Sequence, residues 1–122
     1  MKGFPDLHNA YRLECKSKKP QRLNPDFYLH IREELKENER AATALLDNKD
    51  LEAHIAVRSQ IGFYRRDLMA FLEKRLEKIL LMSLYDLKDS EIRFLQEEED
   101  LRLAVRELTQ KFTQEVNGGE LP

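Results

Sequence analysis

The chain has little of what several protein classes require. Its 122 residues include one cysteine, no tryptophan, four glycines and four prolines. A single thiol, Cys15, cannot form an internal disulfide, which excludes a small disulfide-stapled fold. Scarce glycine and proline argue against a turn-rich β protein, whereas abundant Leu, Glu, Lys, Arg and Ala favour helices. We therefore predict one all-α domain.

Long apolar runs are also missing. No window approaches the roughly 18 consecutive apolar residues of a membrane span. Asp6, His8, Asn9 and Arg12 interrupt the apolar core that a signal peptide would need. The net charge is −2, from 21 basic and 23 acidic residues, so the overall charge gives no reason to expect nucleic-acid or membrane binding. These features predict a soluble intracellular protein.

Catalytic and metal-binding patterns are absent from the sequence as well. His8, His30 and His54 are more than twenty residues apart, and Cys15 has no partner in a CxxC pair. There is no HExxH, no GxSxG and no glycine-rich phosphate loop. We therefore expect no enzymatic activity, no metal site and no cofactor.

Helix-start signals and apolar spacing predict two helices in the first half of the chain. Pro5 and Asp6 open the first, which Pro20 ends at the latest. Asn24 can cap the second, with Pro25 in the first helical position, where no amide is needed. The residues that place one apolar stripe on the second helix are Phe27, Ile31, Leu35, Ala42 and Leu45, and Asn48 interrupts it.

A third, much longer helix is predicted from Asp50 to about Tyr85. Its main apolar positions repeat every 3.6 residues, which favours a globular bundle over a coiled-coil rod; they are Ile61, Tyr64, Leu68, Leu72, Leu76 and Ile79. A second set widens the apolar arc, so this helix is expected to have neighbours on more than one side; this set is Phe63, Met69, Phe71, Leu80 and Leu81. It is the predicted centre of the bundle.

A break between about Asp86 and Gln96 precedes the predicted last helix. Glu97 to Asp100 then fall in its first turn, where the amide dipoles favour negative charge. Asn117, Gly118 and Gly119 stop it. We therefore predict a helical domain over residues 1–116 and the beginning of a linker over 117–122.

Arg75 is the one residue that breaks the local pattern. On a helical wheel it lies beside Leu68, Leu72 and Ile79, inside the apolar face of the long helix. Burying an unpaired guanidinium costs several kcal/mol. Two interpretations remain open: Arg75 reaches solvent along its aliphatic stem, or it pairs with an Asp or Glu in a buried or interfacial contact.

A basic patch precedes the second helix and has no acidic residue within it; its members are Lys16, Lys18, Lys19 and Arg22. It is either a solvated linker or a polar contact surface for a partner or nucleic acid. The cations of the long helix are spread around its circumference and form no continuous basic stripe. DNA contact is therefore expected to be weak and non-specific at most.

Four short motifs occur in a familiar order. They are Tyr11-Arg12-Leu13-Glu14, the LNPDFY segment Leu23–Tyr28, the RLEKI segment Arg75–Ile79 preceded by Asp67, and the LQEEE segment Leu95–Glu99. Together, over residues 7–112, they resemble the helical domain of the GINS replication proteins, most closely the archaeal type that places this domain first. The last motif departs from the LTPEE of that family, because Gln96 replaces threonine and proline is absent.

The resemblance implies a non-enzymatic subunit of the GINS complex, assembled with other GINS subunits into a dimer or tetramer by its helices. It implies a cytoplasmic, nucleoid-associated location at replication forks, where the complex joins the MCM helicase with a RecJ-like protein and also contacts primase or DNA polymerase. Tyr11, Phe27, Tyr28, Arg75 and Lys78 map onto the motifs and are expected in the core or at a subunit interface. The small β-rich domain that follows the linker in the family is absent from these residues.

Two other function classes remain. One is a helical DNA-binding module that uses the basic patch. The other is a generic helical adaptor that holds a partner helix in an apolar groove. The broad apolar arc of the long helix favours assembly with other chains over a lone monomer.

Overall fold

The computed structural model describes residues 6–84 and 94–118. These contain four helices, α1 (Leu7–Lys16), α2 (Phe27–Asp47), α3 (Leu51–Leu84) and α4 (Gln96–Val116), and no strand. The predicted all-α bundle around one long helix is confirmed. Part of the predicted break before α4, together with Tyr85 and Gly119, lies outside the described residues.

Local capping explains where the first two helices begin. Asp6 caps α1, because its side chain accepts a hydrogen bond of 3.0 Å from the Asn9 amide. Asn24 accepts one of 2.9 Å from the Asp26 amide, as expected of a cap. The backbone bond from Phe27 to Asn24 spans only three residues, so a tight turn comes first. Regular α-helix therefore starts at Phe27 and not at Pro25.

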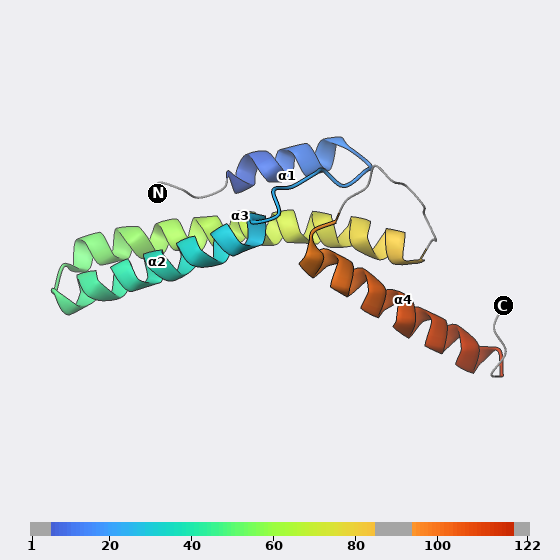
Figure 1. The fold of residues 1–122 in the computed structure, drawn as a ribbon. Coiled ribbons are helices and arrows are strands. Elements are labelled where there is room, and N and C mark those ends of the chain that lie inside the picture. The colour runs from blue at the N-terminus through green and yellow to red at the C-terminus, as the bar shows by residue number, and fades with distance from the viewer. Residues whose placement is uncertain (1–5, 85–93, 119–122) are drawn as a thin grey trace.

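A short connection joins α2 to α3 as a helical hairpin. Asn48 caps the end of α2, and Lys49 adopts a positive φ of 61°. Asp50 accepts a 3.2 Å hydrogen bond from the Ala53 amide and so caps the start of α3. The two helices consequently run back along each other (Figure 1).

Helix α3 is the axis of the fold. In the described part of the chain its backbone contacts α1, α2 and α4, which have no comparable backbone contacts with one another. Figure 1 shows α1 and α2 alongside α3, whereas α4 leaves it at an angle and points away from the other helices. Most of the free length of α4 therefore has no covering helix among the described residues.

The apolar core lies where α1, α2 and α3 meet. Its buried members are Leu7, Ala10, Phe27, Ile31, Tyr64, Phe71 and Leu95. The rings of Phe27 and Phe71 lie 5.3 Å apart between centroids. Of the second apolar set on α3, Phe71 is fully buried, but Phe63, Met69 and Leu81 are more than half exposed. The wide arc thus has one packed side and one open side.

Replacing Phe71 by alanine is expected to lower the free energy of unfolding by about 3–5 kcal/mol, because it leaves a cavity between α2 and α3. The matched control is Phe63→Ala on the same helix, which is expected to change stability by less than about 0.5 kcal/mol because that ring is exposed. Urea unfolding followed by circular dichroism measures both. Equal losses would contradict this placement of the core.

Candidate functional site

Arg75 lies at the centre of a buried polar network. Its side chain is fully buried and does not reach solvent. Its Nε and Nη2 donate to the two carboxylate oxygens of Glu98, at 2.6 and 3.0 Å. Its Nη1 donates to Glu14 Oε1 at 3.0 Å and to the Gln21 carbonyl at 2.8 Å. Of the two interpretations of Arg75, the structure therefore shows the paired one, within a single chain.

Lys78, one turn after Arg75, holds the other side of Glu14. Its Nζ donates to Glu14 Oε2 at 2.5 Å, to the Glu14 carbonyl at 2.6 Å and to the Lys19 carbonyl at 3.1 Å. An ammonium group has three N–H donors, and each has an acceptor here. Lys78 therefore fastens the end of α1 and the following linker to α3.

The two carboxylates are equally well satisfied. Glu14 also accepts from the Gln21 side chain at 2.9 Å, and Gln21 donates in turn to the Ala10 carbonyl at 2.7 Å. Glu98 also accepts from the Tyr28 hydroxyl at 2.8 Å and from the Leu95 amide at 2.9 Å. Two carboxylates face two cations, so the network is neutral as a whole. Buried charges with this degree of pairing do not carry the penalty of a lone ion.

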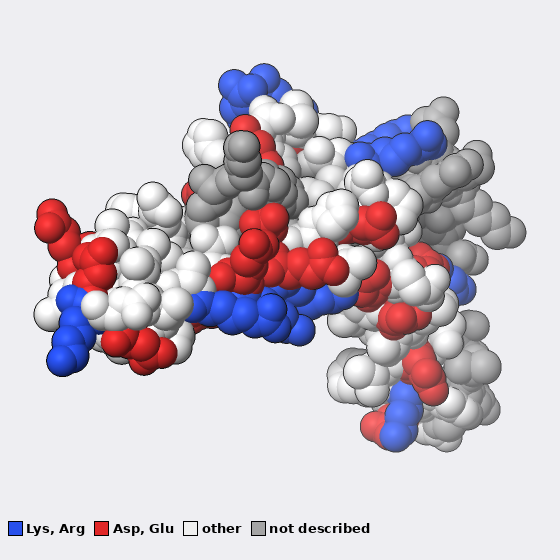
Figure 2. All heavy atoms as spheres, turned by 60° about the vertical axis from the view of Figure 1, so that its left-hand side comes forward, with Lys and Arg blue, Asp and Glu red and all other residues white. Residues whose placement is uncertain are grey.

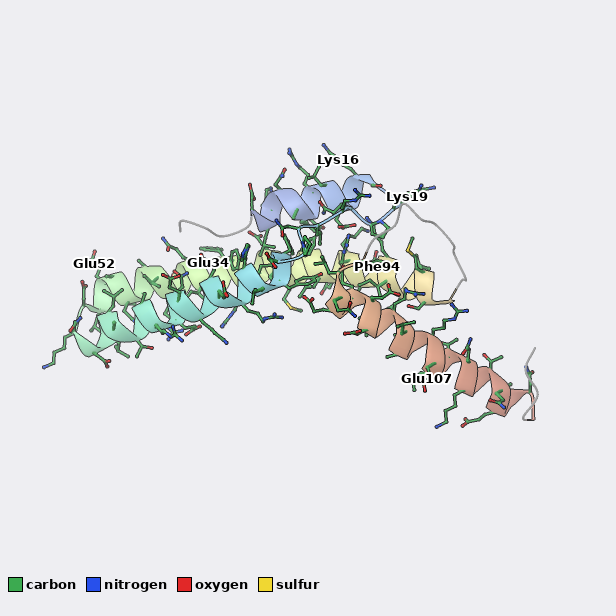
Figure 3. All side chains as sticks on the ribbon, viewed as in Figure 1. Lys16, Lys19, Glu34, Glu52, Phe94 and Glu107 are labelled. Carbon is green, nitrogen blue, oxygen red and sulfur yellow. The ribbon has the colours of Figure 1, made fainter. Side chains whose placement is uncertain are left out.

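The network joins every helix of the described chain. Glu14 comes from α1, Tyr28 from α2, Arg75 and Lys78 from α3, and Glu98 from α4. Phe94 adds a ring whose centroid lies 5.7 Å from the Arg75 guanidinium carbon. Figure 3 shows Phe94 beside α3 at the point where α4 begins. The position of α4 is thus fixed by ion pairs as well as by apolar contact.

Proton affinities in the network follow from these contacts. Burial of the Glu14 carboxyl would raise its pKa, but hydrogen bonds from Lys78 and Gln21 and the charge of Arg75 outweigh burial, so the pKa lies below its ordinary value of 4.5. Burial and the neighbouring Glu98 carboxylate raise the pKa of Tyr28. The Glu98 carboxylate likewise raises the pKa of Arg75 against the opposing effect of burial. Glu14 is therefore a carboxylate and Arg75 a cation at neutral pH.

The sequence carried signals for both partners of Arg75. Glu14 follows Leu7 by seven residues and Ala10 by four, so it shares the buried face of α1 with them. Glu98 occupies the third position of α4, where a glutamate can bond back to the amide before the helix. Within the acidic run of this first turn, Glu98 is buried and Glu99 is half-buried, whereas Glu97 and Asp100 are exposed.

The residues that the sequence singled out fall into two groups. Phe27, Arg75 and Lys78 are buried inside the chain, and Tyr11 and Tyr28 are half-buried against the core. Of the two places expected for these residues, the core and a subunit interface, the first three lie in the interior of the single chain, where their side chains hold the helices together. The large apolar side chains that are exposed lie at other positions, among them Phe63, Leu108 and Phe112.

The basic patch lies at the end of α1 and in the linker after it. Lys16, Lys18, Lys19 and Arg22 are all exposed. Figure 3 shows Lys16 and Lys19 on the side of the molecule where α1 lies. Figure 2 shows Lys and Arg side chains in separate groups, divided by acidic and uncharged surface. This face thus has no continuous basic surface of the kind that follows a nucleic-acid backbone.

An apolar groove lies directly beside the network, between α2, α3 and α4. Its volume is about 330 Å³. Its apolar lining consists of Ile31 and Leu35 from α2, Leu68, Leu72, Leu76 and Ile79 from α3, and Leu101 from α4. The exposed side chains of Arg32 and Glu97 also line it. Arg75 and Glu98 of the network complete the charged part of the lining. A concave, mainly apolar surface with a few charged side chains is suited to holding another helix.

Two chemical searches over the described residues give negative results. No three or more His, Cys, Asp or Glu side chains in residues 6–84 and 94–118 are grouped so as to hold a metal ion. None of the helices in those residues is long and apolar enough to cross a membrane. Comparison of the chain with protein-family models, curated proteins and solved structures gives no match.

Replacing Arg75 by alanine is expected to lower the free energy of unfolding by roughly 3–5 kcal/mol, because Glu98 then loses both donors of its guanidinium partner while buried. Arg75→Lys should lose less, since it keeps the charge but not the two-pronged geometry. Arg65→Ala is the control, because its pair with Glu39 is exposed and its loss should be within error. Thermal and urea unfolding measure all three; unchanged stability in Arg75→Ala would exclude the structural role.

The lowered pKa of Glu14 predicts a pH dependence of stability. Between the native pKa and the ordinary value of 4.5, the unfolded chain binds more protons, so stabilisation by Glu14 is complete above 4.5 and is lost as the pH falls through the native pKa. The difference in unfolding free energy between the wild type and Glu14→Gln should therefore be largest near pH 7 and shrink below 4.5. Glu33→Gln, at an exposed site of α2, is the control. A constant difference for Glu14→Gln would contradict the assignment.

Proposed function

We propose that the chain is a non-enzymatic scaffold subunit of a GINS-type replication complex. In this role its helices assemble with other subunits, and the assembly joins the MCM helicase with a RecJ-like protein and other fork proteins such as primase or DNA polymerase. Its place in the cell would be the nucleoid, at replication forks. The proposal combines the motif resemblance with the geometry of the buried network.

The observation that carries the proposal is the convergence of the four motif segments on one network. Glu14 belongs to the first motif, Tyr28 to the second, Arg75 and Lys78 to the third, and Glu98 to the fourth. The motifs are separated by up to tens of residues in the sequence, and their spacing alone does not require them to meet. Their meeting supports a reading of them as one signature of a shared helical domain.

The outer surface supports an assembly role. Apolar side chains remain exposed on α3 and along α4, and two of them, Leu76 and Leu101, line the apolar groove. Exposed apolar surface that continues over several turns is a feature of protein interfaces. The fold therefore combines a buried ion-pair network with exposed apolar side chains on α3 and α4, and both features suit a subunit that binds other proteins.

The groove also supports the adaptor alternative, in which an unrelated partner helix occupies it. The basic patch offers less support to the DNA-binding alternative, because the face that Figure 2 shows carries Lys and Arg in separate groups. Measured affinity for single- and double-stranded DNA is expected to be weak and insensitive to sequence. Tight binding that falls steeply with salt would favour the DNA-binding class instead.

The proposal is tested by capture of partners with the chain as bait. A second GINS subunit and the MCM helicase from the source organism, each purified, are offered separately and together. Retention of the GINS subunit, with MCM retained through the assembly, is the expected result. An unrelated helical domain of similar size and charge is the control bait. Retention of neither protein by a correctly folded bait would overturn the proposal.

A further inference from the structure

Gly62 lies in the exposed middle of α3, where the described chain gives no reason for a glycine. A methyl group added at this position would have no neighbouring atom within 4 Å, and the backbone there is ordinary α-helix. Glycine is a poor helix former compared with alanine, so it weakens α3 at this point. What glycine does provide is a shallow dent in which the helix backbone can be approached closely.

The residues around this dent are apolar along the helix axis and basic on both sides. On the surface of a helix, the neighbours of a residue lie three, four and seven positions away. For Gly62 they are Ile55, Arg58, Ser59, Arg65, Arg66 and Met69, all of them exposed. The exposed fractions of Ile55 and Met69 are 63% and 57%. The dent therefore interrupts a line of exposed apolar side chains that has arginines beside it.

Positive charge exceeds negative charge around Gly62. Arg58 and Arg65 lie on the side of α3 that faces α2, where they share the carboxylate of Glu39, at 2.5 and 3.1 Å. Arg66 lies on the other side, with its guanidinium carbon 5.4 Å from the centroid of the Phe63 ring. None of the six surface neighbours of Gly62 is acidic. Three cations thus surround the dent with one carboxylate, although the chain as a whole has a net charge of −2.

This combination selects an acidic amphipathic helix. Ile55, Gly62 and Met69 are seven residues apart and so stay on one side of α3 over four turns, which matches a second helix lying along it. The missing side chain at Gly62 leaves room for a bulky apolar residue of that helix. Carboxylates beside that residue would reach the arginines on either side. A nucleic-acid backbone fits less well, because Ile55 and Met69 would face phosphates.

A second copy of this chain does not have the required charge. The free half of α4 carries exposed apolar side chains, Leu108 and Phe112, but its charges balance. The charged residues from Val105 to Val116 are Arg106, Glu107, Lys111 and Glu115. Such a helix brings as many cations as carboxylates to the arginines of α3. The charge around Gly62 therefore favours a helix from a different protein.

We propose that the surface around Gly62 is a docking site for an acidic amphipathic helix of another protein. A bulky apolar side chain of that helix lies over Gly62, between Ile55 and Met69, and its Asp or Glu side chains pair with the three arginines beside the dent. The inference goes beyond the proposed function, because it assigns a surface and a chemical class of partner without requiring that the partner act at replication forks.

The test uses the full chain and three synthetic helices of equal length, with binding measured by fluorescence anisotropy. The acidic probe has a leucine and phenylalanine stripe with glutamates beside it. The basic probe has lysines in place of the glutamates, and the third probe keeps the glutamates but has alanine in the stripe. The acidic probe should bind at least about tenfold more tightly than either of the others, and less tightly as salt is raised. Equal affinities, or no binding of the acidic probe, would overturn the inference.

Gly62→Leu separates docking from folding. Leucine fills the dent, so the dissociation constant for the acidic probe should rise about tenfold or more. The melting temperature should stay the same or rise, because leucine is the better helix former and has open space there. Ala56→Leu is the matched control, since Ala56 is exposed on another side of α3, and it should leave binding unchanged. Unchanged binding in Gly62→Leu would contradict the proposed site.

The arginines are tested as a pair. Arg65→Ala with Arg66→Ala should weaken binding of the acidic probe about tenfold and flatten its salt dependence. Arg12→Ala with Lys111→Ala removes the same charge from exposed positions on α1 and α4, and should have little effect. Equal losses in the two double variants would show that only the overall charge matters, which would overturn the site.

Two other occupants would also be recognised. A homodimer in light scattering that Gly62→Leu dissociates would place a second copy on this surface, and single-stranded DNA that displaces the acidic probe at lower concentration than the unlabelled probe does would place nucleic acid there. Either result would overturn the inference. None of these measurements uses a GINS subunit or MCM, so failure of partner capture contradicts only the proposed function, and failure of probe binding contradicts only this inference.

Discussion

The burial of Arg75 is the constraint on which the rest of the structure depends. A guanidinium removed from water must keep its charge and find acceptors for its donors, and here Glu14, Glu98 and the Gln21 carbonyl accept four hydrogen bonds from Arg75. Those acceptors lie on α1, on α4 and in the linker, so satisfying one residue brings three separate segments to α3. Lys78 completes the set by taking the second oxygen of Glu14. If one member of the network is missing, its partner is left as a buried charge without a counter-ion, which is unfavourable. The helices that supply the members are therefore coupled to one another.

This coupling explains how so small a chain keeps an open apolar surface. The core that α1, α2 and α3 share is modest, and α4 touches the other helices mainly through its first turns. Ion pairs at Glu98 hold those turns firmly, so the remainder of α4 can extend from the body with its apolar stripe exposed. The groove beside the network has the same origin, because the angle at which α4 leaves α3 separates it from α2. The buried network and the exposed apolar surface of α4 thus have the same cause, which is the way Glu98 attaches the first turn of α4 to α3.

Much of the fold followed from local chemistry. Apolar spacing and caps placed the helices to within a few residues, and the start of α2 differed only because the turn from Asn24 to Phe27 is tight. Arg75 stood out because it interrupts an apolar face. Its partners were harder to identify, since Glu98 sits among several glutamates that look alike in sequence. Which glutamate of the run pairs with Arg75 is decided by which side chain points at α3. That direction depends on how α4 packs. The role of Phe27 in the core, by contrast, followed directly from its place in the stripe.

By itself, the sequence determined the all-α fold class, the number and lengths of the described helices, the position that α3 holds at the centre, and the order of the four motifs. Each of these depends on interactions between residues near one another in the chain, such as caps, dipoles and the 3.6-residue repeat. The tertiary structure decided that the motifs meet, that Arg75 pairs instead of reaching solvent, and that α4 stands away from the body. These outcomes depend on contacts between residues far apart in the chain, 23 positions for Arg75 and Glu98 and 61 for Glu14 and Arg75. No local pattern specifies such contacts, because only the packed helices bring the two charges within reach and exclude the water that would otherwise separate them.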